Sequence, residues 1–186
     1  MRILGIDPGL ASTGVGIIER HGETWRQVVA RDVRTAPSAS MPARLQRIYD
    51  LVEGCIREFS PDAVSIESVF TAKNIRTAIL MAHGRGAAIL AASNAKIPVF
   101  EYSPAEIKSS VAGKGSASKT QVMQMVKVLL ALPGLPENDH QADALACALT
   151  HAFRAKLREQ LAGQPAGEMN EAKLLLAQAR RGRRRR

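Results

Sequence analysis

Short apolar segments that end in turn signals or charged residues predict the strands of this chain. Residues 3–6 are apolar and are stopped by Asp7-Pro8-Gly9, and residues 13–19 then alternate, with several β-branched side chains. These two segments predict an antiparallel pair of strands joined by a turn. The remaining strands are predicted at residues 25–33, where the pattern is weaker, at Ala63–Glu67 and at residues 98–102.

Helices are predicted where apolar residues recur with a period of about 3.6 residues. Ser40 is placed as an N-cap with Pro42 in the first turn, and the periodic pattern then runs to residue 59. Four more helices are predicted at Ile75–Asn94, directly after Ser103, at residues 119–130 and at residues 139–158. Because strands that alternate with helices favour parallel pairing, with helices on the faces of the sheet, this order predicts an α/β fold.

Length and composition favour one globular domain with a tail. The chain has 186 residues, of which 46% are hydrophobic and 23% charged. We predict a domain at residues 1–158 and a basic, disordered tail at residues 159–186. The longest apolar run, residues 87–92, is too short for a membrane span, and no signal peptide is recognisable before Asp7. Cys55 and Cys147 are interpreted as small core residues, which fits a reducing cytoplasm.

The net charge of +9 comes largely from the end of the chain. The last seven residues hold six arginines, and removing these six charges from +9 leaves +3. A basic tail attracts polyanions without specifying one, and it is equally compatible with a solvated, disordered end. The charge therefore favours a nucleic acid as partner but identifies no activity.

Acidic residues end two of the predicted strands, Asp7 the first and Glu67 the fourth. A carboxylate at the end of a buried strand is costly unless it binds a cation or an exposed ligand. Taken alone, Asp7 could equally be a turn residue that bonds its own backbone. If the first and fourth strands lie side by side, both carboxylates meet at one edge of the sheet.

The last predicted helix opens with a third acidic group, in the segment 138–143. His140 and Asp143 are three residues apart and share a helix face. The positive end of the helix dipole accounts for Asp139 but poorly for Asp143, which lies within an apolar stretch. Oxygen ligands of this kind suit Mg²⁺ or Mn²⁺, and two such ions can clamp the attacking and leaving oxygens of a phosphodiester.

Residues 113–120, Gly-Lys-Gly-Ser-Ala-Ser-Lys-Thr, come close to a phosphate-binding loop. However, Ser118 stands where the second glycine of that pattern belongs, and the segment follows a predicted helix rather than a strand. We therefore predict no nucleotide site here, although Lys119 and the loop amides remain candidates for contact with a DNA phosphate.

Ordered motifs spread from residue 2 to about residue 153 carry a family resemblance. They are Ile3-Leu4-Gly5-Ile6-Asp7-Pro8-Gly9, Thr13-Gly14-Val15-Gly16, Ile66-Glu67-Ser68-Val69-Phe70, Gly113-Lys114-Gly115-Ser116-Ala117 and Ala142-Asp143-Ala144-Leu145-Ala146. This set resembles the RuvC family of bacterial crossover-junction (Holliday junction) endonucleases. The resemblance implies a ribonuclease-H-like fold, in which three antiparallel leading strands and then parallel strands form a mixed five-stranded sheet flanked by helices.

The resemblance also implies site residues. Asp7, Glu67 and Asp143 match the acidic residues that hold two Mg²⁺ or Mn²⁺ ions in the family. Many members have an aspartate three residues before the last of these, where this chain has His140, and we expect His140 to take that role and to favour Mn²⁺. Whether Asp139 assists or replaces His140 is left open.

Three further residues match DNA-contacting positions of the family. Phe70 matches an aromatic residue that wedges against bases near the junction centre, and Lys108 and Lys119 match lysines near the DNA phosphates. Without the resemblance, Phe70 would be interpreted as a core residue and each lysine as a solvated one.

The activity implied by the resemblance is paired, metal-dependent nicking of two opposed junction strands, which leaves 5′-phosphate and 3′-hydroxyl ends. The implied partners are four-way junction DNA, a second copy of the chain and the branch-migration helicase complex of RuvA and RuvB, with no membrane. An actin-like or sugar-kinase ATPase would need a second domain, for which the chain is too short. A non-catalytic architectural DNA-binding protein explains the basic tail but not the three acidic positions.

Overall fold

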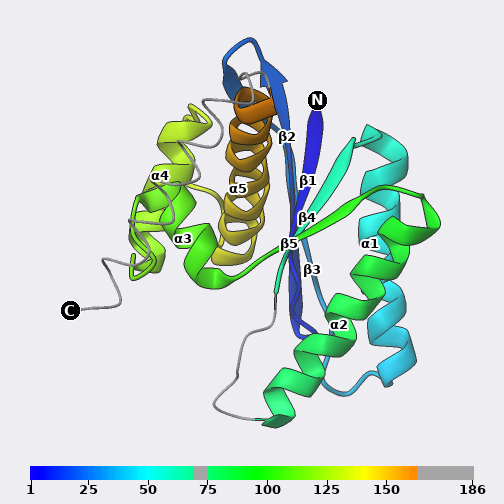
Figure 1. The fold of residues 1–186 in the computed structure, drawn as a ribbon. Helices are drawn as coiled ribbons and strands as arrows, with labels where there is room; N and C mark the ends of the chain where they lie inside the picture. Colours follow the sequence, from blue (N-terminus) through cyan, green and yellow to red (C-terminus); the bar gives the residue numbers. More distant parts are fainter. Residues whose placement is uncertain (69–74, 163–186) are drawn as a thin grey trace, which may run out of the picture. The chain divides into compact units, whose positions relative to one another are not determined.

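The computed structural model describes residues 1–68 and 75–162, which are built around a five-stranded sheet of order β3-β2-β1-β4-β5 (Figure 1). β1, β2 and β3 pair antiparallel, whereas β4 and β5 run parallel to β1. The strands are β1 (Arg2–Asp7), β2 (Ser12–His21), β3 (Thr24–Arg34), β4 (Ala63–Glu67) and β5 (Val99–Tyr102). The structure therefore confirms the mixed sheet, and it places the first and fourth strands side by side, the condition under which Asp7 and Glu67 meet.

The five predicted helices are all present. They are α1 (Met41–Phe59), α2 (Ile75–Asn94), α3 (Pro104–Ala112), α4 (Lys119–Leu129) and α5 (Asp139–Ala162). Ser40 caps α1, and Ser103 and Ser118 form capping boxes with Glu106 and Gln121 at the starts of α3 and α4. These local hydrogen bonds explain why the helix starts could be predicted closely.

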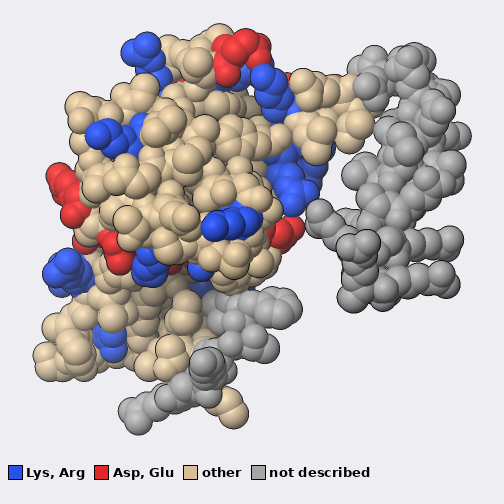
Figure 2. Space-filling view, turned by 90° about the vertical axis from the view of Figure 1, so that its left-hand side faces the viewer, with Lys and Arg blue, Asp and Glu red and all other residues tan. Residues whose placement is uncertain are grey.

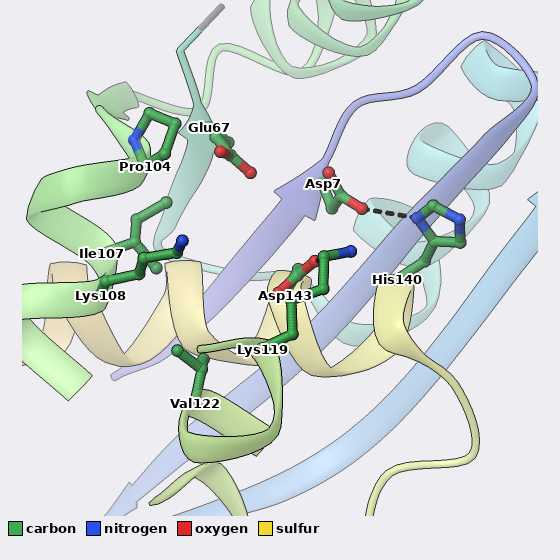
Figure 3. A pocket seen from close by; sticks show the side chains of 9 residues that line it. All are labelled: Asp7, Glu67, Pro104, Ile107, Lys108, Lys119, Val122, His140 and Asp143. Carbon is green, nitrogen blue, oxygen red and sulfur yellow. Dashed lines mark hydrogen bonds and ion pairs between the residues drawn. The ribbon is translucent and has the colours of Figure 1, made fainter. Parts of the chain in front are cut away.

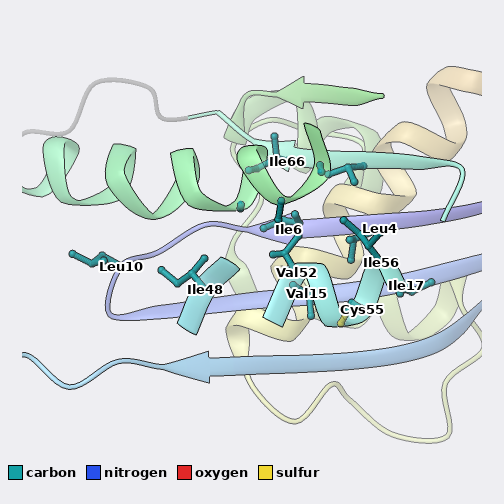
Figure 4. Packing of buried hydrophobic residues seen from close by; sticks show 14 residues of the cluster. Leu4, Ile6, Leu10, Val15, Ile17, Ile48, Val52, Cys55, Ile56 and Ile66 are labelled. Carbon is teal, nitrogen blue, oxygen red and sulfur yellow. The ribbon is translucent and has the colours of Figure 1, made fainter. Parts of the chain in front are cut away.

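One face of the sheet is covered by α1 and α2 (Figure 1). Alternate residues of the strands point to this face, so that Leu4 and Ile6 of β1 pack with Ile48 and Val52 of α1 (Figure 4). All four side chains are fully buried. Burial of each contributes about 1.5–3 kcal/mol, so this layer is a main source of stability and fixes the register of β1.

The opposite face carries α5, with α3 and α4 beside it (Figure 1). α5 packs unusually close to β1, because a Cβ atom at Gly5 would lie 2.0 Å from the carbonyl oxygen of Ala144. The Ser65 hydroxyl of β4 donates a hydrogen bond of 2.7 Å to the carbonyl oxygen of Cys147. Glycine and a small hydroxyl residue thus let the backbone of α5 lie directly against the sheet.

The loop between α3 and α4 follows a helix, as the sequence predicted. Gly113 ends α3 in the left-handed conformation with φ of 77°, and Ser118 is the N-cap of α4. Ser118 therefore serves as a helix cap. A phosphate-binding loop would need glycine at this position and a strand, not a helix, before the loop.

The chain divides into two compact units, Met1–Ala152 and a second unit that begins at Phe153. The first unit contains the sheet, the first four helices and the part of α5 up to Ala152. The second is described only as the end of α5, which runs to Ala162 and so extends past the predicted end at residue 158. Both cysteines are buried, as predicted. No helix in the described part of the chain is long and apolar enough to cross a membrane.

Candidate active site

Two carboxylates lie at the same edge of the sheet because their strands are parallel neighbours. Ile6 of β1 is paired with Ile66 of β4, so Asp7 and Glu67, one residue further on, end adjacent strands. Residues 3, 5 and 7 of β1 share one face of the sheet, as do residues 63, 65 and 67 of β4. Both carboxylates therefore lie on the face that α5 covers.

The first turn of α5 brings two more polar groups to this edge. His140 lies on this turn and Asp143 directly follows it, and the distance of the turn from the sheet is set by Gly14 of β2. A Cβ atom at Gly14 would lie 2.1 Å from the carbonyl oxygen of His140. A larger residue at position 14 would push the helix, and with it His140 and Asp143, away from Asp7.

These four residues line one cavity of about 290 Å³, together with two lysines (Figure 3). The carboxylates of Asp7, Glu67 and Asp143 and the amines of Lys108 and Lys119 point toward the same space. The full lining is Asp7, Glu67, Pro104, Ile107, Lys108, Lys119, Val122, His140 and Asp143. The structure thus brings together six of the seven predicted site residues; Phe70 lies outside the described residues.

Mutual repulsion and burial perturb the carboxylates. Burial raises the pKa of Glu67 to about 7, and the charges of Asp7 and Asp143 add to the increase. The pKa of Asp143 is raised as well, by burial first and then by the charge of Asp7. Perturbations of this kind cluster at functional sites. A cation in the cavity would relieve the repulsion.

Basic side chains partly balance this negative charge. The ring of His140 makes a 2.7 Å hydrogen bond to the Asp7 carboxylate, which raises the pKa of His140. The Lys119 amine lies 3.7 Å from Oδ2 of Asp143 and 3.5 Å from Oδ2 of Asp139. Burial pulls the pKa of Lys119 down, but Asp143 and Asp139 hold it above its ordinary value. Asp139 is therefore a partner of Lys119 at the rim, and its side chain is 58% exposed.

The side chains that Asp7, Glu67, His140 and Asp143 present to the cavity are chemically suited to bind a divalent cation. Three carboxylates and an imidazole are the groups that Mg²⁺ and Mn²⁺ take in proteins. In the described residues no three His, Cys, Asp or Glu side chains stand ready in ligand geometry. Instead, Asp7 bonds to His140 and Asp143 faces Lys119. The residues fit a metal site, in which a bound cation would compete with Lys119 for the Asp143 carboxylate.

Sequence reasoning missed two kinds of residue at this site. The apolar wall formed by Pro104, Ile107 and Val122 follows from the packing of α3 and α4, and no local pattern marks it. Asp32 was also missed: it is a half-buried carboxylate on β3 that bonds to the start of α5. Its single sequence signal is a charge in the middle of a strand pattern.

Fold and site together define a ribonuclease-H-like α/β enzyme domain with an acidic centre at the carboxyl ends of β1 and β4. The sequence model for "Crossover junction endodeoxyribonuclease RuvC" matches residues 3–151. The chain therefore belongs to the RuvC family, whose members are enzymes.

Individual relatives agree with this placement. The RuvC of Ruminiclostridium cellulolyticum is 46% identical over 151 residues, which is 81% of this chain and 91% of that protein. The RuvC of Desulforamulus reducens is 45% identical and covers 82% of this chain and 93% of its own length. A solved structure of RuvC from Thermus thermophilus in complex with a Holliday junction substrate has a TM-score of 0.81 at 37% identity, covering 84% of this chain and 96% of that one.

Proposed function

We propose that this protein resolves Holliday junctions by paired, metal-dependent nicking of two opposed strands in homologous recombination and DNA repair. The observation that carries the proposal is the cavity in which Asp7, Glu67 and Asp143 face two lysines. Carboxylates alone repel a phosphodiester, whereas carboxylates that hold cations beside lysines attract one. Membership of the RuvC family supports junction DNA as the substrate.

The residues that would hold two Mg²⁺ or Mn²⁺ ions are Asp7, Glu67, His140 and Asp143. Asp7 ends the central strand of the sheet, beside Glu67 and His140, so it is the best placed to be shared by both ions. When bound, such ions supply positive charge at the scissile phosphate and a water of lowered pKa. The predicted products are a 5′-phosphate and a 3′-hydroxyl.

Lys108 and Lys119 would hold the scissile phosphate at the carboxylates. Both amines point into the cavity, and Lys119 already pairs with two carboxylates (Figure 3). With Asp143 among the residues that would hold a cation, the Lys119 amine would be available to a phosphate oxygen. Further Lys and Arg side chains are spread over the α3–α4 side of the molecule, with fewer acidic ones among them (Figure 2). They would contact the DNA backbone and add affinity without sequence specificity. We assign Phe70 to a wedge against bases near the junction centre.

A second copy of the chain would supply the second cut. Helix α2 exposes Ile75, Ile79 and Leu90, and an apolar groove of about 450 Å³ lies between α1 and α2 beside Leu90 and Tyr49. Two copies joined across this face would present two active sites related by twofold symmetry, as two symmetric cuts require. RuvA and RuvB are the proposed helicase partners, and the cytoplasm is the proposed location.

Cleavage of a labelled mobile four-way junction, beside a linear duplex of the same sequence, tests the proposal. We expect paired nicks in the junction alone, in Mg²⁺ or Mn²⁺, and none with chelator. Asp7→Asn should abolish cleavage and leave junction binding intact, because binding depends on phosphate contacts. Junction binding without cleavage in either metal would instead favour an architectural protein, and near-normal cleavage by Asp7→Asn would refute the assigned site.

A further inference from the structure

The start of α5 is tied to the neighbouring strand β3 through one carboxylate, that of Asp32. Oδ1 of Asp32 accepts a hydrogen bond of 2.8 Å from the side-chain amide of Asn138 and one of 2.9 Å from that of Gln141. Asn138 in turn caps the helix, since its Oδ1 accepts a 3.0 Å hydrogen bond from the backbone N–H of Gln141. Strand, cap and first helical turn are thus linked by three hydrogen bonds.

These bonds lie in a partly buried place, where they are stronger than on an open surface. The side chain of Asp32 is 18% exposed, and Gln141 is buried. The two donated hydrogen bonds, from Gln141 first and then Asn138, hold the pKa of Asp32 below its ordinary range. Asp32 therefore stays charged at neutral pH, near the positive end of the α5 dipole.

The position of Asp32 on β3 is also linked to the distance between α5 and the sheet. In the β2–β3 ladder Asp32 is paired with Gly14, the residue whose missing side chain makes room for the His140 backbone. The backbone of Gly14 therefore limits how closely α5 can approach the sheet, and the hydrogen bonds to Asp32 hold the first turn of α5 against it. Asn138 and Gln141 flank His140 in the chain, and Gln141 is two residues before Asp143. His140 sits on the turn that Asp32 holds, and Asp143 directly follows that turn.

We propose that Asp32 is a positioning residue of the active site, which fixes the first turn of α5 so that His140 and Asp143 meet Asp7 and Glu67. Asp32 is not among the residues that line the cavity, and it acts through Asn138 and Gln141. This role rests on the proposed function only in so far as the fixed groups bind a metal. The anchoring of the helix turn can be measured independently of any activity.

Hydrogen exchange measures the anchoring. Asp32→Ala should increase the exchange rate of the amides in the first turn of α5, at Gln141 and Ala142, by about tenfold or more, because local opening of this turn becomes easier. Asp32→Asn keeps a carbonyl oxygen that can accept both amide hydrogen bonds, and it should restore most of the protection.

Binding of Mn²⁺ without DNA measures the consequence for the site. Partners behind metal ligands typically change metal affinity by 10–100-fold, so Asp32→Ala should weaken Mn²⁺ binding by about tenfold and Asp32→Asn much less. Free Mn²⁺ can be counted by electron paramagnetic resonance on the full-length protein, freed of metal beforehand. Junction binding in chelator should not change, since the phosphate contacts are elsewhere.

Arg31→Ala is the matched control. Arg31 neighbours Asp32 on β3 but points to the other face, where it makes hydrogen bonds of 2.7 and 3.0 Å to Glu58 of α1. It should lower the melting temperature without changing exchange in α5 or Mn²⁺ affinity. If Asp32→Ala is too unstable to purify, Gln141→Met removes one of the two donors and should give the same two changes, each smaller.

The possible outcomes separate this role from the proposed function. If Asp32→Ala and Arg31→Ala have the same exchange rates in α5 and the same Mn²⁺ affinity, the positioning role is refuted. Failure of Asp32→Asn to restore protection would also refute a role through hydrogen bonding. If the wild-type protein binds no Mn²⁺ at all, the metal-dependent function fails, whereas the exchange comparison still decides whether Asp32 anchors the helix.

Discussion

Nδ1 of His140 lies 2.7 Å from Oδ2 of Asp7, within hydrogen-bond distance. An ionised carboxylate can only accept a hydrogen bond, so Nδ1 is the donor and Nε2 is left for another partner. A residue that could act as a ligand is thereby held against the carboxylate at the centre of the site. The hydrogen bond spans 133 positions of the chain and depends on the close approach of α5 to β1 and β2.

Replacing His140 should change the metal preference. Imidazole favours Mn²⁺ over Mg²⁺ more than a carboxylate does. His140→Ala removes one of the proposed metal ligands altogether, so it should lower the cleavage rate on the order of 100-fold. His140→Asp should retain activity and raise the Mg²⁺ rate relative to the Mn²⁺ rate. Junction cleavage rates in each metal give this ratio. A wild-type protein that cleaves equally fast or faster in Mg²⁺ would show that His140 confers no Mn²⁺ preference.

Adding one methyl group at Gly5 should destabilise the fold strongly. Its Cβ would lie 2.0 Å from the carbonyl oxygen of Ala144, so α5 would have to move away from the sheet. We expect a loss of about 3 kcal/mol or more in the free energy of unfolding, measured with urea, together with loss of cleavage.

Gly54→Ala is the control for this substitution. Gly54 lies inside α1, and a Cβ atom there would meet nothing within 4 Å. Because alanine is the better helix former, this change should stabilise the protein by about 0.5–1 kcal/mol. A Gly5→Ala protein as stable as Gly54→Ala would contradict the close packing of α5.

How much could be predicted from sequence depended on the distance over which each interaction acts. The helix starts at Ser40, Ser103 and Ser118 were predictable because caps involve residues three apart. The meeting of Asp7 and Glu67 could be predicted only on the condition that the first and fourth strands are neighbours, and the parallel pairing of β1 with β4 fulfils this condition. The roles of Asp32 and Gly14 could not, because each depends on a contact with α5 across more than a hundred residues.

A charge on the exposed side of α2 should prevent self-association. Leu90 is 54% exposed and borders the groove between α1 and α2, so Leu90→Glu should shift the protein to monomer in sedimentation velocity at micromolar concentration. The comparable change Val128→Glu places the same charge at a 67% exposed residue of α4 and should leave the oligomeric state unchanged. A wild-type monomer, or a dimer that tolerates Leu90→Glu, would place the interface elsewhere or exclude it.

The metal-free protein should become less stable as the pH rises from about 5 to about 8. The folded state holds a proton on Glu67 up to pH about 7, whereas the unfolded chain releases it near the ordinary value of 4.5, so the folded state binds more protons in between. The raised pKa values of His140 and Asp143 act in the same direction. Asp32 does not oppose them in this range, because its pKa is lowered and it is already ionised.

This pH dependence can be measured as the melting temperature in chelator, which should fall by roughly 5 °C over that range. Glu67→Gln removes the main titrating group while keeping its shape, so its melting temperature should depend less on pH and exceed that of the wild type at about pH 8. Added Mn²⁺ should raise the melting temperature of the wild type most at high pH, because the carboxylates must be deprotonated to bind it. A wild-type stability that rises between pH 5 and 8, or a Glu67→Gln variant with an unchanged slope, would show that Glu67 is not the buried, proton-binding carboxylate of this site.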